Sequence, residues 1–596
     1  MSSPSDELPG VVDSLWRSMR LGFRAEPWLL LLAFFASLGA AVPDALIALA
    51  LKFFADAAAV GDGRGVLAAA LFLGLLSTAG WLLRLVAERT NRRFADRSTV
   101  TIESHVAHLQ ASVPSIEHHE RPDYLDRLSV LRDQVFALNH LYSSLFTTVG
   151  AGFRLVVTVG LLMSVHPALG LLVVFAIPTV WVSSWRAGVE RVVQEENAQH
   201  NRLARHLFLM GTTAPPGKEV RVARVEQRLI DDRRAAWERW YRPVARVRWA
   251  SAAWQAAGWG VFGAAFVAAI SFASAGINAG PGDVLLVLAA SSRLSQYVGQ
   301  TVSEANFLRG IWLDASRRLA WLEDYAAAQR DAADLAAPEE LADGFRLEGV
   351  SFRYPGTDRW VLRDVDLHLP AGRIVAVVGE NGAGKTTLVK LLSRFYEPTE
   401  GSIKVDGIEL ARIPADDWRE LTAGAFQDFF RFEYRASRSV GLGDLPRSDD
   451  RPAVEQGVER AGAEDVVASL VSGLDTQLGP TWRDGVELSH GQWQKVALAR
   501  GFMREVPLLL ALDEPTAALD AETEHALFER YAVAARETRG GRVTVLVSHR
   551  FSTVRMADLI IVINDGRIAE QGTHEELMSL HGRYSELYGI QAQAYQ

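Results

Sequence analysis

Hydrophobic residues are distributed very differently in the two halves of the chain. In the first 310 residues, long apolar stretches alternate with arginine-rich ones, whereas the remainder has the mixed pattern of a water-soluble protein. A helix needs about 20 mostly apolar residues to cross the hydrocarbon core of a membrane, and such long runs are hard to explain as buried helices of a soluble protein. They predict six spanning helices, at 28–55, 65–87, 140–165, 167–186, 249–276 and 282–308.

Arginine is concentrated in the long segments that follow the second and fourth predicted spans. Because positively charged loops remain in the cytoplasm, we expect these segments and both chain ends on the cytoplasmic side of a cell membrane. The turns near Gly61, His166 and Asn278 are short and nearly free of Lys and Arg, so we expect them outside. Each long segment is interrupted by a proline-bearing stretch, at 115–126 and 214–220, which predicts a short crossing helix between two helical extensions.

The pattern also predicts where the domains begin and end. Residues 1–25 are expected to form an N-terminal leader, either an amphipathic helix on the inner membrane surface or a frayed end. Residues 26–325 form the predicted transmembrane domain. An alanine-rich and acidic linker follows over 326–344. Over 345–596, short β-branched runs alternate with helical segments, which is typical of an α/β domain with a largely parallel sheet.

Composition removes several classes of function. The net charge of −9 gives no reason to expect nucleic acid, which favours a basic face, so we expect no such partner. The chain has no cysteine, which excludes disulfides, thiolate metal sites and cysteine nucleophiles. Residues 1–10 are polar and acidic and lack the pattern of a cleavable signal peptide, so none is expected.

The ionisable residues inside the predicted spans include Arg84, Arg154, Arg293 and Glu304. A charge inside a membrane is costly and usually faces a cavity or a partner. For Arg84 and Glu304, near the cytoplasmic ends, reaching back to the lipid head groups explains the position equally well. Arg154 lies deeper in its span, and two roles are open for it: lining a translocation cavity, or a purely structural one.

The second half contains a complete phosphate-loop sequence. It follows an apolar strand at Ile374–Val378 and runs into a helix at Thr387–Arg394, which is the context that this motif requires. Backbone N–H groups would surround phosphate oxygens, Lys385 would neutralise the β- and γ-phosphates of ATP, and the Thr386 hydroxyl would bind Mg²⁺. The residues expected to contact the nucleotide here are Gly379, Glu380, Asn381, Gly382, Ala383, Gly384, Lys385, Thr386 and Thr387.

A second strand, Leu508–Leu512, ends in two adjacent carboxylates. In a phosphate-loop protein, the first acid after such a strand holds Mg²⁺ and the second polarises the attacking water. We therefore predict that Asp513 binds the metal and that Glu514 is the catalytic base.

Residues 488–492 read Leu-Ser-His-Gly-Gln, which resembles the LSGGQ signature of ATP-binding-cassette (ABC) proteins. With six spans and two cytoplasmic extensions, nearly the whole chain resembles a half-transporter of the exporter type, called the type IV fold. The resemblance implies an α-helical six-span transmembrane domain followed by an α/β P-loop nucleotide-binding domain. It also implies an ATPase that works as a dimer and exports a hydrophobic or amphipathic small molecule, a lipid or a peptide.

The resemblance assigns further roles residue by residue. Tyr354 matches the aromatic residue that stacks on adenine, although a tyrosine before proline in a turn is otherwise often packing. Gln427 matches the glutamine that senses Mg²⁺, and Asp520 matches the loop that communicates across the dimer. His549 matches the catalytic histidine that contacts the γ-phosphate. The signature residues that would face the ATP held by the opposite chain are Ser489, Gly491 and Gln492.

Two departures from the family pattern bear on assembly. His490 replaces a glycine that approaches the γ-phosphate, and residues 482–485 read Trp-Arg-Asp-Gly where exporters have a Gly-Glu-Arg-Gly-like stretch. Histidine adds bulk where glycine suits a close approach, which favours a heterodimer with an intact partner. A homodimer remains the commoner assembly, and we expect it here.

Two other functions are compatible with parts of the pattern. An importer built on the same fold would carry the same motifs, so the direction of transport stays open. A non-transport ABC ATPase would share the second half only, and the six predicted spans argue against it. The identity of the substrate cannot be derived, because transport cavities are lined by ordinary apolar and polar residues.

Overall fold

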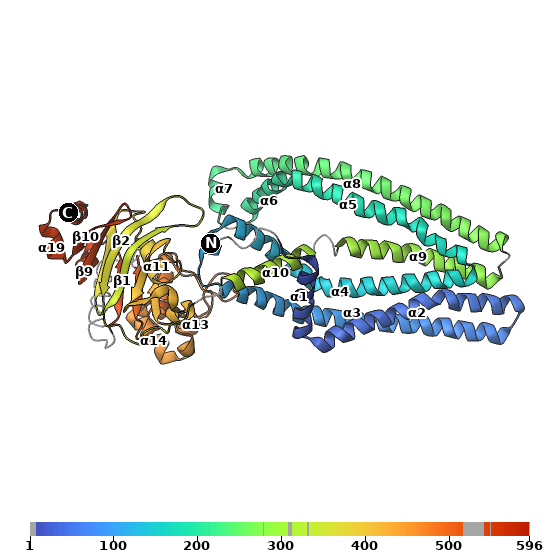
Figure 1. Cartoon of the computed structure of the whole chain (residues 1–596), viewed down its shortest axis with the longest axis horizontal. Helices are drawn as coiled ribbons and strands as arrows, with labels where there is room; N and C mark the ends of the chain where they lie inside the picture. Colours follow the sequence, from blue (N-terminus) through green and yellow to red (C-terminus); the bar gives the residue numbers. More distant parts are fainter. Residues whose placement is uncertain are drawn as a thin grey trace. The chain divides into compact units, whose positions relative to one another are not determined.

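The computed structural model describes residues 8–213, 215–277, 279–307, 313–329, 333–515, 541–548 and 550–594. The chain divides into two compact units. Unit 1 comprises residues 1–109 and 127–325, and unit 2 comprises residues 110–126 and 326–596. Long helices make up unit 1, and the strands belong to unit 2 (Figure 1).

The helices of unit 1 are long, and α3 alone has 49 residues. Their bounds are α1 (Val11–Ala25), α2 (Pro27–Val60), α3 (Gly63–Ala111), α4 (Pro122–Val165), the 3-10 helix η2 (Pro167–Ala176), α5 (Ile177–Glu196), α6 (Ala198–Thr212), α7 (Gly217–Ala223), α8 (Glu226–Ser271), the π-helical turn η3 (Phe272–Gly276), α9 (Pro281–Phe307) and α10 (Leu313–Ala328).

Five segments of the described chain are long and apolar enough to cross a membrane: Pro27–Val60, Gly63–Ala111, Tyr142–Val165, Pro167–Glu196 and Glu226–Gly276. They correspond to the first five predicted spans. The sixth predicted span forms α9, a helix of 27 residues that is not among the five. Its sequence is less apolar, because charged and hydroxyl-bearing residues recur along it.

Proline occupies two different positions in these segments. Pro43 lies inside α2, as the sequence suggests. Pro178 lies within the membrane-length segment Pro167–Glu196, as the second residue of α5, where the chain passes from the 3-10 helix η2 into α-helix. The first turn of a helix accommodates proline because its N–H would have no intrahelical acceptor there.

Polar contacts join the helices of unit 1. Helix α5 packs along α8 (Figure 1). Helix α2 packs against α9. Lys52 on α2 forms an ion pair with Asp283 on α9, close to where the Asp56 carboxylate accepts a hydrogen bond from the Gly282 N–H (3.0 Å). Glu304 accepts a hydrogen bond from the Ser144 hydroxyl. The Glu304 carboxylate therefore has a hydrogen-bond donor within the protein, in addition to any contact with lipid head groups.

A carboxylate that sequence reasoning did not single out, Asp44, organises the deeper charges. Arg293 Nη1 donates to Asp44 Oδ1 (2.5 Å), and the Tyr297 hydroxyl donates to Oδ2 (3.0 Å). Arg154 Nη1 lies 3.9 Å from Asp44 Oδ2, and its Nη2 donates to Gln300 Oε1 (3.4 Å). Charges in a low-dielectric interior need such partners. The deep arginine thus belongs to a polar cluster that joins α2, α4 and α9.

Unit 2 contains two sheets and the helices that cover them. The strands are β1 (Gly344–Arg353), β2 (Trp360–Pro370), β3 (Ile374–Gly379), β4 (Glu400–Val405), β5 (Ile408–Glu409), β6 (Thr422–Ala425), β7 (Leu509–Asp513), β8 (Val543–Val547), β9 (Leu559–Asn564) and β10 (Arg567–Gly572). The helices are η1 (Glu117–Glu120), α11 (Lys385–Leu392), η5 (Leu410–Arg412), α12 (Ala415–Glu420), α13 (Ala436–Gly441), η6 (Leu445–Arg447), α14 (Arg451–Arg460), α15 (Glu464–Ser469), η7 (Gly473–Asp475), α16 (His490–Gly501), α18 (Phe551–Val554), α19 (His574–Ser579) and α20 (Arg583–Ala594).

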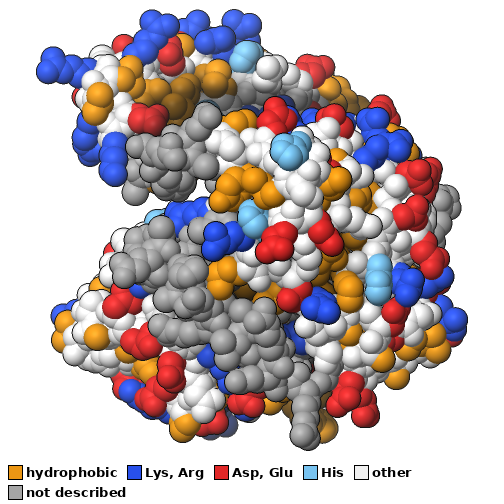
Figure 2. Space-filling view, turned by 90° about the vertical axis from the view of Figure 1, so that its left-hand side faces the viewer, with side chains coloured by type: hydrophobic (Ala, Val, Ile, Leu, Met, Phe, Trp, Pro, Cys, Tyr) orange, Lys and Arg blue, Asp and Glu red, His pale blue; other side chains and the backbone are white. Residues whose placement is uncertain are grey.

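The larger sheet has the order β10-β9-β3-β8-β7-β6 and is parallel except for β10. Strands β7 and β8 are buried along their whole length, which explains their continuous apolar sequences. The smaller sheet is antiparallel, with the order β2-β1-β4-β5. Charged side chains of both signs are interspersed over the face seen in Figure 2.

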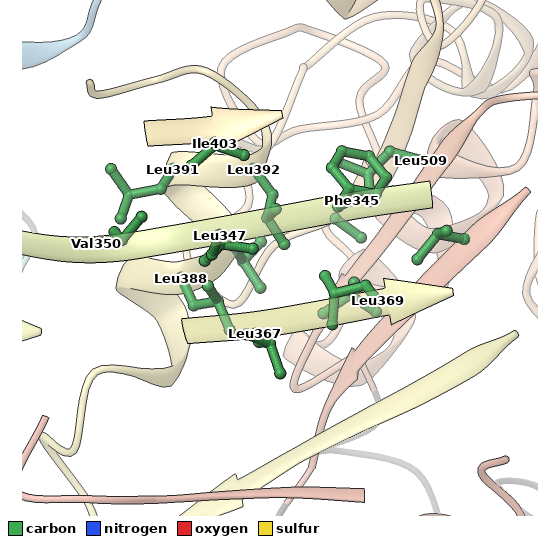
Figure 3. Close-up of a cluster of buried hydrophobic side chains, with 14 of the residues drawn as sticks. Phe345, Leu347, Val350, Leu367, Leu369, Leu388, Leu391, Leu392, Ile403 and Leu509 are labelled. Atoms are coloured by element: carbon green, nitrogen blue, oxygen red, sulfur yellow. The ribbon is translucent and has the colours of Figure 1, made fainter. Parts of the chain in front are cut away.

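A single apolar core holds α11 between the two sheets. Leu388 and Leu392 of α11 lie beside Leu347 of β1, and Leu367 of β2 closes the same cluster (Figure 3). Each of these side chains is buried. The helix that follows the phosphate loop is therefore fixed by packing as well as by its covalent link to β3.

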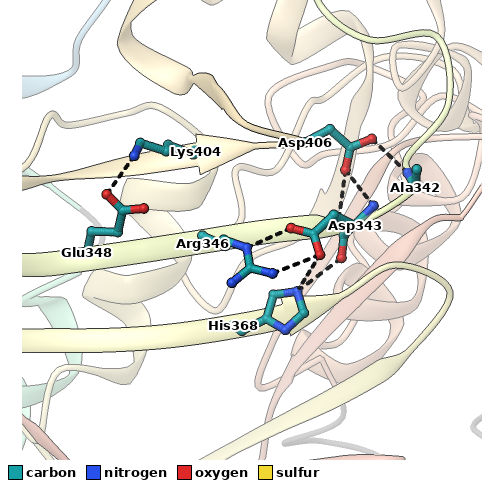
Figure 4. Close-up of polar contacts among 8 residues, drawn as sticks. Ala342, Asp343, Arg346, Glu348, His368, Lys404 and Asp406 are labelled. Atoms are coloured by element: carbon teal, nitrogen blue, oxygen red, sulfur yellow. Dashed lines mark hydrogen bonds and ion pairs between the residues drawn. The ribbon is translucent and has the colours of Figure 1, made fainter.

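Asp406, in the turn between β4 and β5, fixes the start of the α/β domain (Figure 4). Its carboxylate accepts hydrogen bonds from the N–H groups of Ala342 (2.7 Å), Asp343 (2.9 Å) and Gly344 (2.7 Å). Arg346 donates twice to the Asp343 carboxylate, and this hydrogen bonding lowers the pKa of Asp343. These contacts hold the end of the linker against β1.

The segment between α3 and α4 belongs to unit 2. The Ile116 N–H donates to the Phe395 carbonyl (3.1 Å), and the Arg419 guanidinium donates to the Pro114 carbonyl. The short helix η1, which sequence reasoning expected in this segment, follows directly. The connection between two membrane helices is thus packed against the α/β domain next to the end of α11.

We predict that Trp418→Phe destabilises the protein by about 1–3 kcal/mol. Trp418 is fully buried, and its indole N–H donates to the Leu392 carbonyl at the end of α11 (2.9 Å). Phenylalanine leaves that carbonyl without its donor and a small cavity in its place. Thermal unfolding of the full chain in detergent should show a lower midpoint. Trp482→Phe, at a position that is 52% exposed, is the matched control, and equal midpoints for the two variants would contradict the assignment.

Candidate nucleotide site

The phosphate loop occupies the turn between β3 and α11, as its sequence predicts. Lys385 is the first residue of α11, and its Nζ donates to the carbonyls of Gly379 (3.0 Å) and Glu380 (2.9 Å). The ammonium group therefore lies across the loop. Burial lowers the pKa of Lys385, while Glu514 and Asp513 oppose that shift. An anion placed in the loop would favour the charged form further.

Gly384 shows why the loop needs glycine. It caps α11 with a φ of +111°, a backbone conformation that other residues rarely adopt. A Cβ built there would lie 2.7 Å from the Leu362 side chain and 3.1 Å from the Val361 carbonyl. Strand β2 therefore packs directly on the loop, and a residue without a side chain is required at this position.

Strand pairing brings the acidic residues to the same edge of the sheet as the loop. Strand β8 pairs in parallel with both β3 and β7, and Asp513 at the end of β7 lies opposite Val547. The carboxyl ends of parallel strands meet at one edge, where ligands bind in open α/β sheets. Thr386 Oγ1 consequently donates to Asp513 Oδ1 across 3.3 Å.

Asp513 is 1% exposed, and burial raises the pKa of its carboxyl group. The Thr386 hydrogen bond and Lys385 oppose the shift, whereas Glu514 and Asp428 reinforce it. A hydroxyl and a carboxylate oxygen are the ligands that Mg²⁺ takes beside phosphate. The pair Thr386 and Asp513 thus fits the metal that the sequence implies, and a divalent cation would keep this carboxylate ionised.

Glu514 has a strained backbone. Its φ of +47° lies in the left-handed region, which a residue with a Cβ enters at an energetic cost. The Glu514 N–H donates to the Val547 carbonyl (3.0 Å), and its own carbonyl accepts from Gln494 Nε2 (3.2 Å). Its side chain accepts a hydrogen bond from Gln427 Nε2 (2.9 Å). The two residues expected to handle water and metal are therefore in direct contact.

Tyr354 lies at the other side of the same cavity. Its hydroxyl is 3.0 Å from Thr387 Oγ1, and its ring packs edge-on against Phe352 and Tyr396. The cavity has a volume of 710 Å³, enough for a nucleotide. Sequence reasoning missed three of its residues, Thr357, Arg359 and Val361, which carry no motif. The full lining is Tyr354, Thr357, Arg359, Val361, Asn381, Gly382, Gly384, Lys385, Thr386, Thr387, Gln427 and Glu514.

The signature residues do not line this cavity. Ser489 caps α16 by accepting from the Gln492 N–H, and the Gln492 side chain accepts from the Ser489 N–H. The His490 ring lies 5.5 Å from that of Phe429, and its Nδ1 is 3.5 Å from Arg431 Nη2. The side chain that replaces glycine is thus held by its own chain. Asp520 and His549 lie outside the described residues.

Comparisons with known proteins agree with this geometry. Residues 362–517 match the ABC transporter family. The ATP-dependent lipid A-core flippase of Ralstonia nicotianae is 43% identical over 248 residues, which are 41% of this chain and 40% of that protein. The flippase of Pseudomonas aeruginosa is 33% identical over 313 residues, 52% of this chain and 50% of that protein. The matched region thus spans half or less of the length of these curated relatives.

A solved structure resembles the whole chain. A bacterial Atm1-family ABC exporter with ATP bound superposes with a TM-score of 0.74 over 98% of both chains, at 23% sequence identity. This likeness confirms the predicted fold class, a helical membrane-type region followed by an α/β nucleotide-binding domain. The chain therefore contains a segment, residues 362–517, that matches the ABC transporter family, joined in one polypeptide to a helical domain with the fold seen in an ABC exporter.

Proposed function

We propose that this protein is an ATP-hydrolysing ABC exporter subunit that moves a lipid-like amphipathic molecule across the cell membrane. The observation that carries the proposal is the assembly of Lys385, Thr386, Asp513 and Glu514 at one sheet edge, in a chain whose described residues include five membrane-length helical segments. The names of the curated relatives, lipid A-core flippases, favour a lipid over a peptide. The phosphate loop holds ATP, and Mg²⁺ supplies charge neutralisation at the phosphates.

Each residue of the site then has a role in hydrolysis. Lys385 neutralises the β- and γ-phosphates, and Thr386 with Asp513 holds the metal, with Gln427 beside them. Glu514 accepts the proton of the attacking water, because its carboxylate already lies beside a polar side chain that can orient a water molecule. Tyr354 offers its ring to adenine, and His549 would contact the γ-phosphate.

The membrane arrangement belongs to the same proposal. Residues 26–325 form the transmembrane domain, with 1–25 at its inner surface, and residues 345–596 form the nucleotide-binding domain after the linker. The arginine-rich extensions, both chain ends and the nucleotide-binding domain lie in the cytoplasm. Inside-out vesicles that accumulate a fluorescent lipid with ATP would support export, and ATP-dependent depletion would support the importer built on this fold.

We propose a homodimer. In ABC exporters the signature of one chain faces the nucleotide of the other, so the site is complete only in a dimer. His490 packs on Phe429 of its own chain, which supports a signature that accommodates the substitution. ATPase activity of the chain expressed alone, with two equivalent nucleotides per dimer, is the expected result. An inactive chain rescued by a second half-transporter would establish a heterodimer instead.

Glu514→Gln should reduce ATP turnover by about 10²–10⁴-fold while ATP binding persists, because an amide cannot accept the proton of water. The measurement is phosphate release by the full chain, together with binding of labelled ATP. Glu575→Gln, an exposed acid in the first turn of α19, is the matched control. Turnover of the Glu514 variant at the parental rate would remove this residue from catalysis.

Lys385→Ala should weaken ATP binding about tenfold to a hundredfold, because a charge-assisted hydrogen bond to phosphate is lost. Equilibrium binding of labelled ATP to the full chain measures the effect. The control is Lys404→Ala on β4, whose ammonium group pairs with Glu348. Equal affinities of the two variants would contradict the assignment of Lys385.

A further inference from the structure

A second cavity lies entirely within unit 1, between α5, α8 and α9. Its volume is 280 Å³, at the small end of ligand pockets, which suits a head group rather than a whole lipid. We call it the Arg186 cleft. It is lined by Thr179, Val182, Ser183, Arg186, Ala187, Glu190, Ser251, Gln255, Trp259, Val298, Gly299 and Val302.

The cleft holds two opposite charges that do not neutralise each other. Arg186 Nε donates to Ser251 Oγ (3.0 Å), and Nη2 donates to the Val247 carbonyl (3.1 Å). In the described chain, no acceptor is within hydrogen-bond distance of its Nη1. Glu190 lies one turn further along α5, yet it forms no ion pair with Arg186 and no hydrogen bond to any described residue. One guanidinium edge and one carboxylate are thus available in a single small cleft.

Its other walls are suited to an amphipathic group. Ser183 and Gln255 are joined by a hydrogen bond (3.0 Å) and add neutral polar atoms. Trp259 and the valines provide apolar surface. A Cβ built on Gly299 would be in ordinary van der Waals contact with the edge of Trp259, at 3.8 Å, so this position accepts a Cβ without displacing its neighbours.

The sequence places the cleft at the level of a membrane–water boundary. Arg186 is the first charged residue after the apolar run that begins at Pro167, and Arg248 is the last one before the apolar run of α8. Tryptophan concentrates at such boundaries. Trp181, Trp185 and Trp254 are all exposed and in ring contact at this level. Lipid head groups occupy the same depth.

We propose that the Arg186 cleft binds a zwitterionic head group, with its phosphate or carboxylate at Arg186 and its ammonium at Glu190. Charge-assisted hydrogen bonds of both signs select such a group over a purely anionic one. This inference rests on the proposed function in that it names the chemistry of the lipid-like substrate. The group is carried either by an ethanolamine lipid or by a soluble zwitterion.

Native mass spectrometry of the full chain in detergent tests the site without ATP, so its outcome is independent of the ATPase assays. Phosphatidylethanolamine is titrated against phosphatidylglycerol, which has the phosphate but no ammonium. We expect one preferred phosphatidylethanolamine site per chain. Glu190→Gln should weaken phosphatidylethanolamine binding about tenfold and leave phosphatidylglycerol binding unchanged.

Arg186→Gln should weaken the binding of both lipids. Gly299→Leu, which fills the cleft and keeps every charge, should also weaken the binding of both. The matched controls are Arg191→Gln and Glu195→Gln, exposed charges on α5 that do not line the cleft. Competition by O-phosphoethanolamine distinguishes the sources: displacement of the lipid indicates that the head group alone suffices, and no displacement indicates a lipid. Equal lipid preference in the Glu190 variant and its control would overturn the proposal.

Discussion

The parallel pairing of β3, β8 and β7 is the constraint on which the nucleotide site depends. Lys385 and Asp513 are more than 100 residues apart in sequence, and only strand pairing brings the ends of β3 and β7 to one edge. All three strands are buried, so the pairing is held by apolar packing on both faces. The polar site is thus a consequence of an apolar core, which also fixes α11 beneath the loop.

A different constraint governs unit 1, where the cost of removing charge from water decides the contacts. Arg293 with Asp44 and Lys52 with Asp283 each join two helices that the sequence separates widely. Breaking such a pair would leave a partly buried charge without compensation. Most charged side chains deep in unit 1 therefore stabilise contacts between helices. The Arg186 cleft differs, because Arg186 and Glu190 both line it and form no ion pair with each other, and this difference is the basis for proposing a ligand site there.

Much of the nucleotide-binding domain could be predicted, because a phosphate loop has an invariant local geometry. The strands before Gly379 and Asp513 lie where their apolar runs indicate. The residues Thr357, Arg359 and Val361 could not be predicted, since a residue can line a cavity without belonging to a recognisable sequence motif. Asp44 was missed because one carboxylate barely changes the hydropathy of a long apolar run. The sixth predicted span shows the same limit of hydropathy as a predictor. Polar side chains of α9 form hydrogen bonds with other helices, and a hydropathy average does not register such contacts.

Contacts within unit 2 connect the candidate nucleotide site to the segment between α3 and α4. Glu514 accepts from Gln427, whose neighbour Phe426 packs its ring 5.5 Å from that of Phe395. The Phe395 carbonyl in turn accepts from Ile116. Proximity alone does not transmit a change; an element with two arrangements is required. The strained φ of Glu514 is the point in this series of contacts at which a change in backbone would move the carboxylate and its hydrogen bond to Gln427 together.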